Sequence, residues 1–169
     1  MLTKVKKQRS AMLRVYLASD HGGFELKKKI ISFLKKERKD KKDNKHDKYH
    51  LQDLGPFSYD PDDDYPDYVI PLAKSVARDA KSLGIVLCKN GQGVCIAVNK
   101  VKGIRGVTGF SKEMVASTRA DDHANVVCLP ASYLSEKEVK EIVILFLKTP
   151  FSGAKRHQRR LAKVRKLER

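Results

Sequence analysis

The segment that most constrains the fold is residues 83–100, with the sequence LGIVLCKNGQGVCIAVNK. An apolar run, residues 85–87, ends at Cys88, and a short glycine-containing loop separates it from a second apolar stretch at 94–98. This order is typical of a buried strand that leads through a loop into a helix. Such a loop presents backbone N–H groups to an anion, and a cysteine there can act as a thiolate. The alternative is that Cys88 is a small buried apolar side chain.

The rest of the chain alternates between short apolar runs and segments of helical periodicity. This alternation predicts an α/β fold with a five-stranded parallel sheet and helices on both faces. Ligands bind such sheets at the carboxyl ends of the strands, so residues 19–23, residues 88–93 and Gly109 are predicted to share one edge. Strands are predicted at 13–18, 49–54, 84–88, 104–108 and 126–129, and helices at 24–34, 68–83, from Gly93, after Ser111, at 135–147 and from about Ala154.

The charge of the chain is concentrated in three segments. The formal net charge of +16 comes almost entirely from residues 4–9, 35–48 and 155–169, which leaves the body near neutrality. Residues 35–48 have no apolar face, so the segment is predicted to begin as a helix end and continue as a surface loop. These segments can attract nucleic acid or an anionic surface, but no aromatic residues alternate with the charges. Solvated lysine-rich surface is therefore the favoured interpretation, with nucleic acid not the expected partner.

Length and cysteine content restrict the class of protein further. The 169 residues suit one domain, and no apolar run reaches the length of a membrane span. The three cysteines, Cys88, Cys95 and Cys128, lack the spacing of a zinc site or a disulfide framework. We therefore expect free thiols and a cytoplasmic location.

Six short motifs occur in one order along the chain. They are SDHGGFELK at 19–27, DYPDY at 64–68, CKNGQG at 88–93, AVNKVKGIR at 97–105, ANVVCL at 124–129 and RHQRR at 156–160. With these motifs the chain resembles the type B ribose-5-phosphate isomerase family, which also includes galactose-6-phosphate isomerase subunits. The resemblance spans about residues 13–163. It implies a single Rossmann-like domain that forms a homodimer, or a larger assembly such as a tetramer, with active sites shared between subunits. The expected organisation is a basic extension at 1–11, an isomerase domain at 12–153 and a basic helix or tail at 154–169 that packs on the partner subunit.

The resemblance also implies a reaction and roles for individual residues. The family interconverts aldose and ketose phosphates without metal or cofactor, by proton transfer between C1 and C2 through an enediolate. Cys88 is then the base, and the following loop holds the enediolate oxygens. Asp20 is expected to contact substrate and to cap a helix, and His21 to contact substrate. The remaining substrate-binding residues implied by the resemblance are Tyr65, Lys89, Asn90, Gly91, Gln92, Gly93, Asp122, Arg156 and Arg160, the two arginines lying one helical turn apart to hold the phosphate across the dimer interface.

The chain departs from the family pattern at several site positions. Asp121 stands where the family often has the histidine that assists ring opening, and Asp122 stands where it has asparagine. We assign ring opening to Asp121, with His123 and His21 as alternatives. Lys89 replaces a glycine, Asn90 replaces a threonine or serine while keeping an amide that can donate a hydrogen bond, and an arginine expected near Ser132 is absent.

The sequence thus predicts a cytoplasmic enzyme of carbohydrate metabolism, in the pentose phosphate pathway. Its expected reaction is the isomerisation of ribose 5-phosphate to ribulose 5-phosphate. One alternative is a six-carbon sugar-phosphate isomerase of the same family. The other is a non-catalytic descendant that binds nucleic acid through its basic tails.

Overall fold

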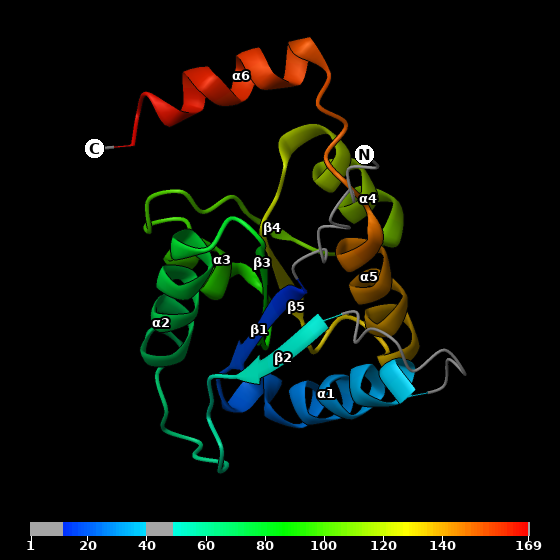
Figure 1. The fold of residues 1–169 in the computed structure, drawn as a ribbon. Coiled ribbons are helices and arrows are strands. Elements are labelled where there is room, and N and C mark those ends of the chain that lie inside the picture. The colour runs from blue at the N-terminus through cyan, green and yellow to red at the C-terminus, as the bar shows by residue number, and fades with distance from the viewer. Residues whose placement is uncertain (1–11, 40–48, 169) are drawn as a thin grey trace, which may run out of the picture.

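A parallel sheet forms the centre of the molecule. The computed structural model describes residues 12–39 and 49–168 (Figure 1). Five strands pair in parallel in the order β2-β1-β3-β5-β4, which confirms the predicted α/β fold. The strands are β1 (Leu13–Ser19), β2 (Tyr49–Asp53), β3 (Ser82–Cys88), β4 (Gly106–Thr108) and β5 (Val126–Pro130). The helices are η1 (His21–Gly23), α1 (Phe24–Lys39), α2 (Tyr65–Arg78), α3 (Gln92–Val98), α4 (Lys112–Asp122), α5 (Glu136–Lys148) and α6 (Lys155–Arg165).

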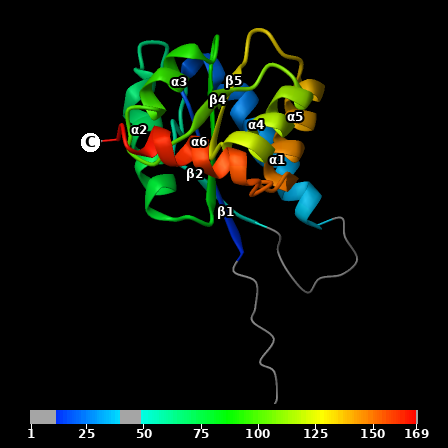
Figure 2. The ribbon, with the colours of Figure 1, turned by 90° about the horizontal axis from the view of Figure 1, so that it is seen from above.

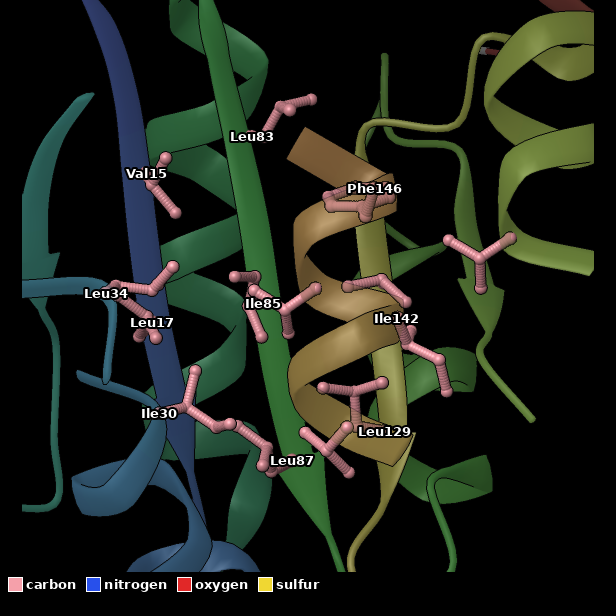
Figure 3. Close-up of a cluster of buried hydrophobic side chains, with 14 of the residues drawn as sticks. Val15, Leu17, Ile30, Leu34, Leu83, Ile85, Leu87, Leu129, Ile142 and Phe146 are labelled. Carbon is pink, nitrogen blue, oxygen red and sulfur yellow. The ribbon is translucent and has the colours of Figure 1, made fainter. Parts of the chain in front are cut away.

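Helices cover both faces of the sheet, so the core has two apolar clusters. One cluster joins the sheet to α1, α4 and α5, and the other joins it to α2 and α3. Figure 3 shows the first cluster, with Leu34 of α1 and Ile142 of α5 on the same side of the sheet as Ile85. Every residue of β3 is buried because this central strand is covered on both faces. Successive side chains alternate between the faces, which places Cys88 in the cluster with α2 and α3.

Two serines cap the helices that follow them. The Ser111 hydroxyl accepts a hydrogen bond from the N–H of Met114 at the start of α4. Ser135 and Glu138 form a reciprocal capping box at the start of α5. These contacts satisfy N–H groups that have no partner within the helix.

The helix predicted at 68–83 is wrong at both ends. α2 begins at Tyr65, because Pro66 needs no N–H partner in the first turn of a helix. It ends at Arg78, and a turn follows in which the Asp79 carboxylate accepts a hydrogen bond from the N–H of Lys81. As a result β3 starts at Ser82 and not at residue 84. The strand predicted at 104–108 likewise starts later, at residue 106.

The C-terminal segment lies at the edge of the sheet where the strands begin. Figures 1 and 2 show α6 across this amino edge, reaching from the side of α2 to that of α4. The N–H of Ser152 donates to the carbonyl of Ala120, and the N–H of Gly103 donates to the Glu168 carboxylate at 3.1 Å. Two residues of α6, His157 and Leu161, are buried.

The charged segments are only partly described. Residues 35–39 form the last turn of α1, as the sequence predicts. The rest of the 35–48 segment and the N-terminal extension at 1–11 lie outside the described residues. None of the helices described here is long and apolar enough to cross a membrane.

Candidate active site

Cys88 ends the central strand, and the loop after it folds back onto the sulfur. The N–H of Gly91 donates to the Cys88 Sγ at 3.1 Å. Gly91 has a φ of 75°, and a Cβ there would lie 3.1 Å from the backbone nitrogen of Pro130, so the turn requires glycine. The loop thus returns to the sulfur and leaves it beside a backbone N–H group.

Asn90 orients the same loop through its amide oxygen. This oxygen accepts a hydrogen bond from the N–H of Gln92 at 3.0 Å and lies 3.8 Å from the Cys88 Sγ. The oxygen is thus used within the loop. The NH2 group, which the sequence suggested as a donor, makes no hydrogen bond with the residues that the structure describes.

The 3-10 helix η1 packs directly beside this loop. Asp20 caps it, as expected, by accepting a hydrogen bond from the N–H of Gly23 at 3.1 Å. Burial raises the pKa of Asp20. A Cβ on Gly23 would lie 2.6 Å from the Leu87 Cβ, and one on Gly22 would lie 2.9 Å from the backbone nitrogen of Lys89. Glycine at both positions therefore lets η1 approach the end of β3.

His21 is held by an acid that the sequence analysis missed. Its Nδ1 lies 2.7 Å from Asp63 Oδ1, and its backbone N–H donates to the same oxygen at 2.9 Å. The hydrogen bond with Asp63 raises the pKa of His21, and the charge of Asp20 adds to the effect. Asp63 belongs to the acidic run 60–64, in which the sequence does not distinguish the one carboxylate that faces the histidine.

Tyr65, the first residue of α2, closes one side of the loop. A Cβ on Gly93 would lie 3.0 Å from its ring, so glycine allows the close approach of α3 and α2. The strand ends and these contacts bring one set of residues together, which we call the carboxyl-edge group. It consists of Asp20, His21, Tyr65, Cys88, Lys89, Asn90, Gly91, Gln92 and Gly93.

The other predicted site residues lie at the opposite edge of the sheet and form the amino-edge group: Asp121, Asp122, Arg156 and Arg160. Asp121 Oδ1 is 3.5 Å from Nε2 of His157, and the Arg156 Nε donates to that same nitrogen at 2.9 Å. His157 is buried and was missed by the sequence analysis, because it lies within a run of basic residues. Arg156 and Arg160 are both exposed, one helical turn apart.

The two groups cannot meet within one chain. Cys88 is the last residue of β3, whereas Asp121 precedes the first residue of β5, which pairs with Gly84 near the start of β3. The seven residues of β3 span about 20 Å at the usual rise of a strand. The predicted site is therefore divided into two half-sites at opposite edges.

The side chain of His123 packs against a neighbouring aromatic ring. Its φ of 53° ends α4 in the left-handed conformation, and its ring stacks on Phe151 with a centroid distance of 4.6 Å. Burial and the charges of Arg105 and Arg119 lower the pKa of His123. These contacts give the ring a structural role at the end of α4.

The acids of the carboxyl-edge region are used as hydrogen-bond acceptors. Asp20 receives the Gly23 N–H, and Asp63 receives both donors of His21. Within residues 12–39 and 49–168, no three His, Cys, Asp or Glu side chains are arranged to hold a metal ion. The chemistry that this edge offers directly is thiol, imidazole and carboxylate chemistry beside a loop of N–H donors.

Comparison with known proteins agrees with this geometry. The sequence model of the ribose/galactose isomerase family matches residues 15–164. The chain is 40% identical over 155 residues to the probable ribose-5-phosphate isomerase B of Mycoplasma genitalium, covering 91% of this chain and 95% of that protein. It is 39% identical over 157 residues to ribose-5-phosphate isomerase B of Mycobacterium tuberculosis, covering 93% and 91% of the two chains.

Solved structures show the same fold. The crystal structure of the Mycoplasma genitalium enzyme with bound ribulose-5-phosphate has a TM-score of 0.83 and 39% identity, over 92% of this chain and 96% of that one. The type B ribose 5-phosphate isomerase of Trypanosoma brucei has a TM-score of 0.83 and 34% identity, over 93% and 99%. The match in sequence, in fold and over nearly the full length shows that this chain belongs to the ribose/galactose isomerase family.

Proposed function

We propose that this chain is an aldose–ketose isomerase that converts ribose 5-phosphate to ribulose 5-phosphate. Its relatives are ribose-5-phosphate isomerases, and one of them has been solved with ribulose-5-phosphate bound. The observation on this chain that best supports the proposal is the hydrogen bond from the Gly91 N–H to the Cys88 Sγ. It lies at the carboxyl edge of the sheet, where ligands of such folds bind.

Cys88 is proposed as the base of the reaction. Its thiolate removes the proton from C2 of the open-chain aldose, the C–H electrons form the C1–C2 double bond, and the carbonyl oxygen on C1 becomes an oxyanion. The proton then returns from the Cys88 thiol to C1, and the C2 hydroxyl proton moves to the C1 oxygen, which gives the ketose and restores the thiolate. In the 89–93 loop the Gly91 and Gln92 N–H groups already donate to the Cys88 Sγ and the Asn90 Oδ1. The N–H groups of Asn90 and Gly93 are therefore the ones proposed to stabilise the enediolate oxygens.

We further propose that two chains complete each site. The carboxyl-edge group offers the base and the oxyanion loop, and the amino-edge group offers exposed arginines suited to a phosphate. Their separation within one chain supports a homodimer in which residues 154–169 pack on the partner. In this arrangement Arg156 and Arg160 of one chain hold the phosphate of a sugar bound beside Cys88 of the other.

The proposed location of the reaction is the cytosol. Cys88, Cys95 and Cys128 are all free thiols, as expected in a reducing compartment. A five-carbon substrate is preferred over a six-carbon one because the relatives reported above act on ribose 5-phosphate.

One assay tests the proposed function. The purified protein is given ribose 5-phosphate and a six-carbon aldose phosphate, and ketose formation is measured. Cys88→Ser should lower turnover on the active substrate about 100-fold or more, since a serine hydroxyl is a much weaker base. Cys95→Ser is the matched control and should retain turnover.

The alternatives give different results in the same assay. Preference for the six-carbon substrate would move the chain to the other branch of the family. If neither sugar phosphate is turned over and the protein binds nucleic acid in a salt-sensitive way, the non-catalytic alternative would be favoured over the isomerase.

A further inference from the structure

Asp63 is an acid held inside the protein beside the candidate site. Its side chain is 3% exposed, although the segment between β2 and α2 that carries it lies largely at the surface. Oδ1 accepts both the backbone N–H and the ring Nδ1 of His21, whereas Oδ2 is buried and has no hydrogen-bond partner among the described residues. A buried carboxylate is costly unless its charge is balanced. Among the described residues, the cationic partner of Asp63 is His21.

The pairing determines which nitrogen of His21 faces outward. Because Asp63 Oδ1 is an acceptor, Nδ1 must carry a proton, and Nε2 is the nitrogen left for other contacts. The imidazole is 38% exposed, so Nε2 can reach a ligand. The second hydrogen bond, to the backbone N–H, fixes the position of Asp63 relative to η1. Since η1 packs on the loop after Cys88, the ring is held at the mouth of the carboxyl-edge group.

The segment that carries Asp63 is held at its start by a lysine of α1. Lys27 of α1 is fully buried, and its Nζ donates to Asp53 Oδ1 at 2.6 Å and to the carbonyl of Pro56 at 2.8 Å. Asp53 Oδ1 also accepts the N–H of Gly55. These contacts fix the start of the segment, and the start of α2 at Tyr65 fixes its end. Asp63 is thus a fixed acceptor.

We propose that Asp63 is a positioning residue of the isomerase, which orients His21 and balances its positive charge so that Nε2–H is presented to the phosphate of the sugar. The inference rests on the proposed function for the identity of the substrate. A dianionic phosphate is the part of such a substrate that gains most from a cationic donor. Asp63 itself does not touch the ligand.

The charges around the imidazole agree with this role. Asp20 faces the ring from its own segment, Asp63 from the segment before α2, and Tyr68 of α2 lies near Asp63. Lys89, on the loop after Cys88, packs its backbone against Gly22. The hydrogen bond with Asp63 and the neighbouring acids raise the pKa of His21. The cationic form then persists to higher pH than in an unpaired histidine.

Asp63→Asn tests the proposal, because it keeps the size of the side chain and removes the charge. The matched control is Asp62→Asn, which alters an exposed acid of the same run. The His21 imidazole is titrated by NMR in the intact protein and assigned with His21→Gln. In Asp63→Asn its pKa should move down toward the ordinary value of about 6.5, and in Asp62→Asn it should not move.

Phosphate binding provides the second measurement. Inorganic phosphate is titrated into each variant by calorimetry, which does not require turnover. Near pH 8 Asp63→Asn should bind phosphate about tenfold more weakly, and the difference should narrow near pH 6, where the imidazole is protonated in both proteins. In the isomerase assay the KM should rise in parallel while kcat changes about twofold or less.

The outcomes separate the two claims. If the wild type fails to isomerise ribose 5-phosphate but the titration and phosphate results appear, the proposed function fails and the pairing of Asp63 with His21 stands. An unchanged His21 titration, or a loss confined to kcat, overturns the positioning role. The double variant Asp63→Asn with His21→Gln guards against general misfolding. It should bind phosphate no more weakly than His21→Gln alone, because Asp63 acts through His21.

Discussion

The division of the site between two edges of the sheet predicts that two inactive chains can restore each other. One chain carries Cys88→Ser, which removes the base. The other carries both Arg156→Ala and Arg160→Ala, which removes the phosphate ligands of the amino-edge group. The two groups lie about 20 Å apart within a chain, so in the proposed homodimer they meet where the two chains adjoin.

The expected activity follows from counting sites. In a heterodimer of the two variants, one site combines both defects and the other combines an intact Cys88 with intact arginines. A tandem-purified heterodimer carrying two different affinity tags should therefore show about half of the wild-type turnover per dimer. If subunits are instead mixed at equal amounts and exchange freely, about half of the dimers are hybrids and about a quarter of the activity returns.

The assay is isomerisation of ribose 5-phosphate, with each homodimeric variant as a blank. A tandem-purified pair in which both chains carry Cys88→Ser controls for contaminating wild-type enzyme. A hybrid no more active than the sum of its two parents would refute the reasoning, since it would mean that each site is built from one chain.

Three further predictions come from individual contacts. Lys27→Met should lower the free energy of unfolding by about 2–4 kcal/mol in urea titrations, because Asp53 and the Pro56 carbonyl lose their donor. The control Lys28→Met, at an exposed lysine, should change it by about 0.5 kcal/mol or less. Equal stability of the two variants would contradict the role of the buried amine. Hydrogen bonding from Cys128, with lesser contributions from neighbouring side chains, lowers the pKa of Cys95 to about 6. In the Cys88→Ser variant, the alkylation of Cys95 measured by mass spectrometry should therefore rise with a midpoint near that pH. Alkylation that begins only above about pH 8 would contradict the lowered pKa of Cys95. Asp121→Asn should slow turnover of ribose 5-phosphate more than that of a four-carbon aldose phosphate that cannot close a ring, and equal slowing would place Asp121 outside ring opening.

Much of the fold could be predicted because it depends on local pattern. The apolar run that ends at Cys88 is a strand in the structure, and parallel pairing places its end beside Asp20, as the sequence indicated. The predicted end of the helix at 68–83 was wrong because the apolar spacing continues through residues 79–81, whereas the backbone turns there around Asp79. Periodicity does not report where a chain leaves a helix.

The site could be predicted less completely, because it depends on contacts between distant residues. Asp63 reaches His21 across 42 residues of sequence, from an acidic run in which several carboxylates look alike. His157 is buried among basic neighbours, and its closeness to Asp121 depends on how α6 crosses α4. The separation of the half-sites did have a sequence signal, since Cys88 ends its strand and Asp121 precedes one.

The exposed apolar residues of the C-terminal segment have a consequence for how assembly and ligand binding are linked. With His157 and Leu161 buried on its own chain, and Val164 and Leu167 of the C-terminal segment 53% and 80% exposed, the helix has apolar surface left for a second subunit. A sugar phosphate held between α6 of one chain and the Cys88 loop of another would bind the assembled form and not the separate chains. By mass action it would then oppose dissociation on dilution, so substrate concentration and protein concentration would set the fraction of working enzyme together.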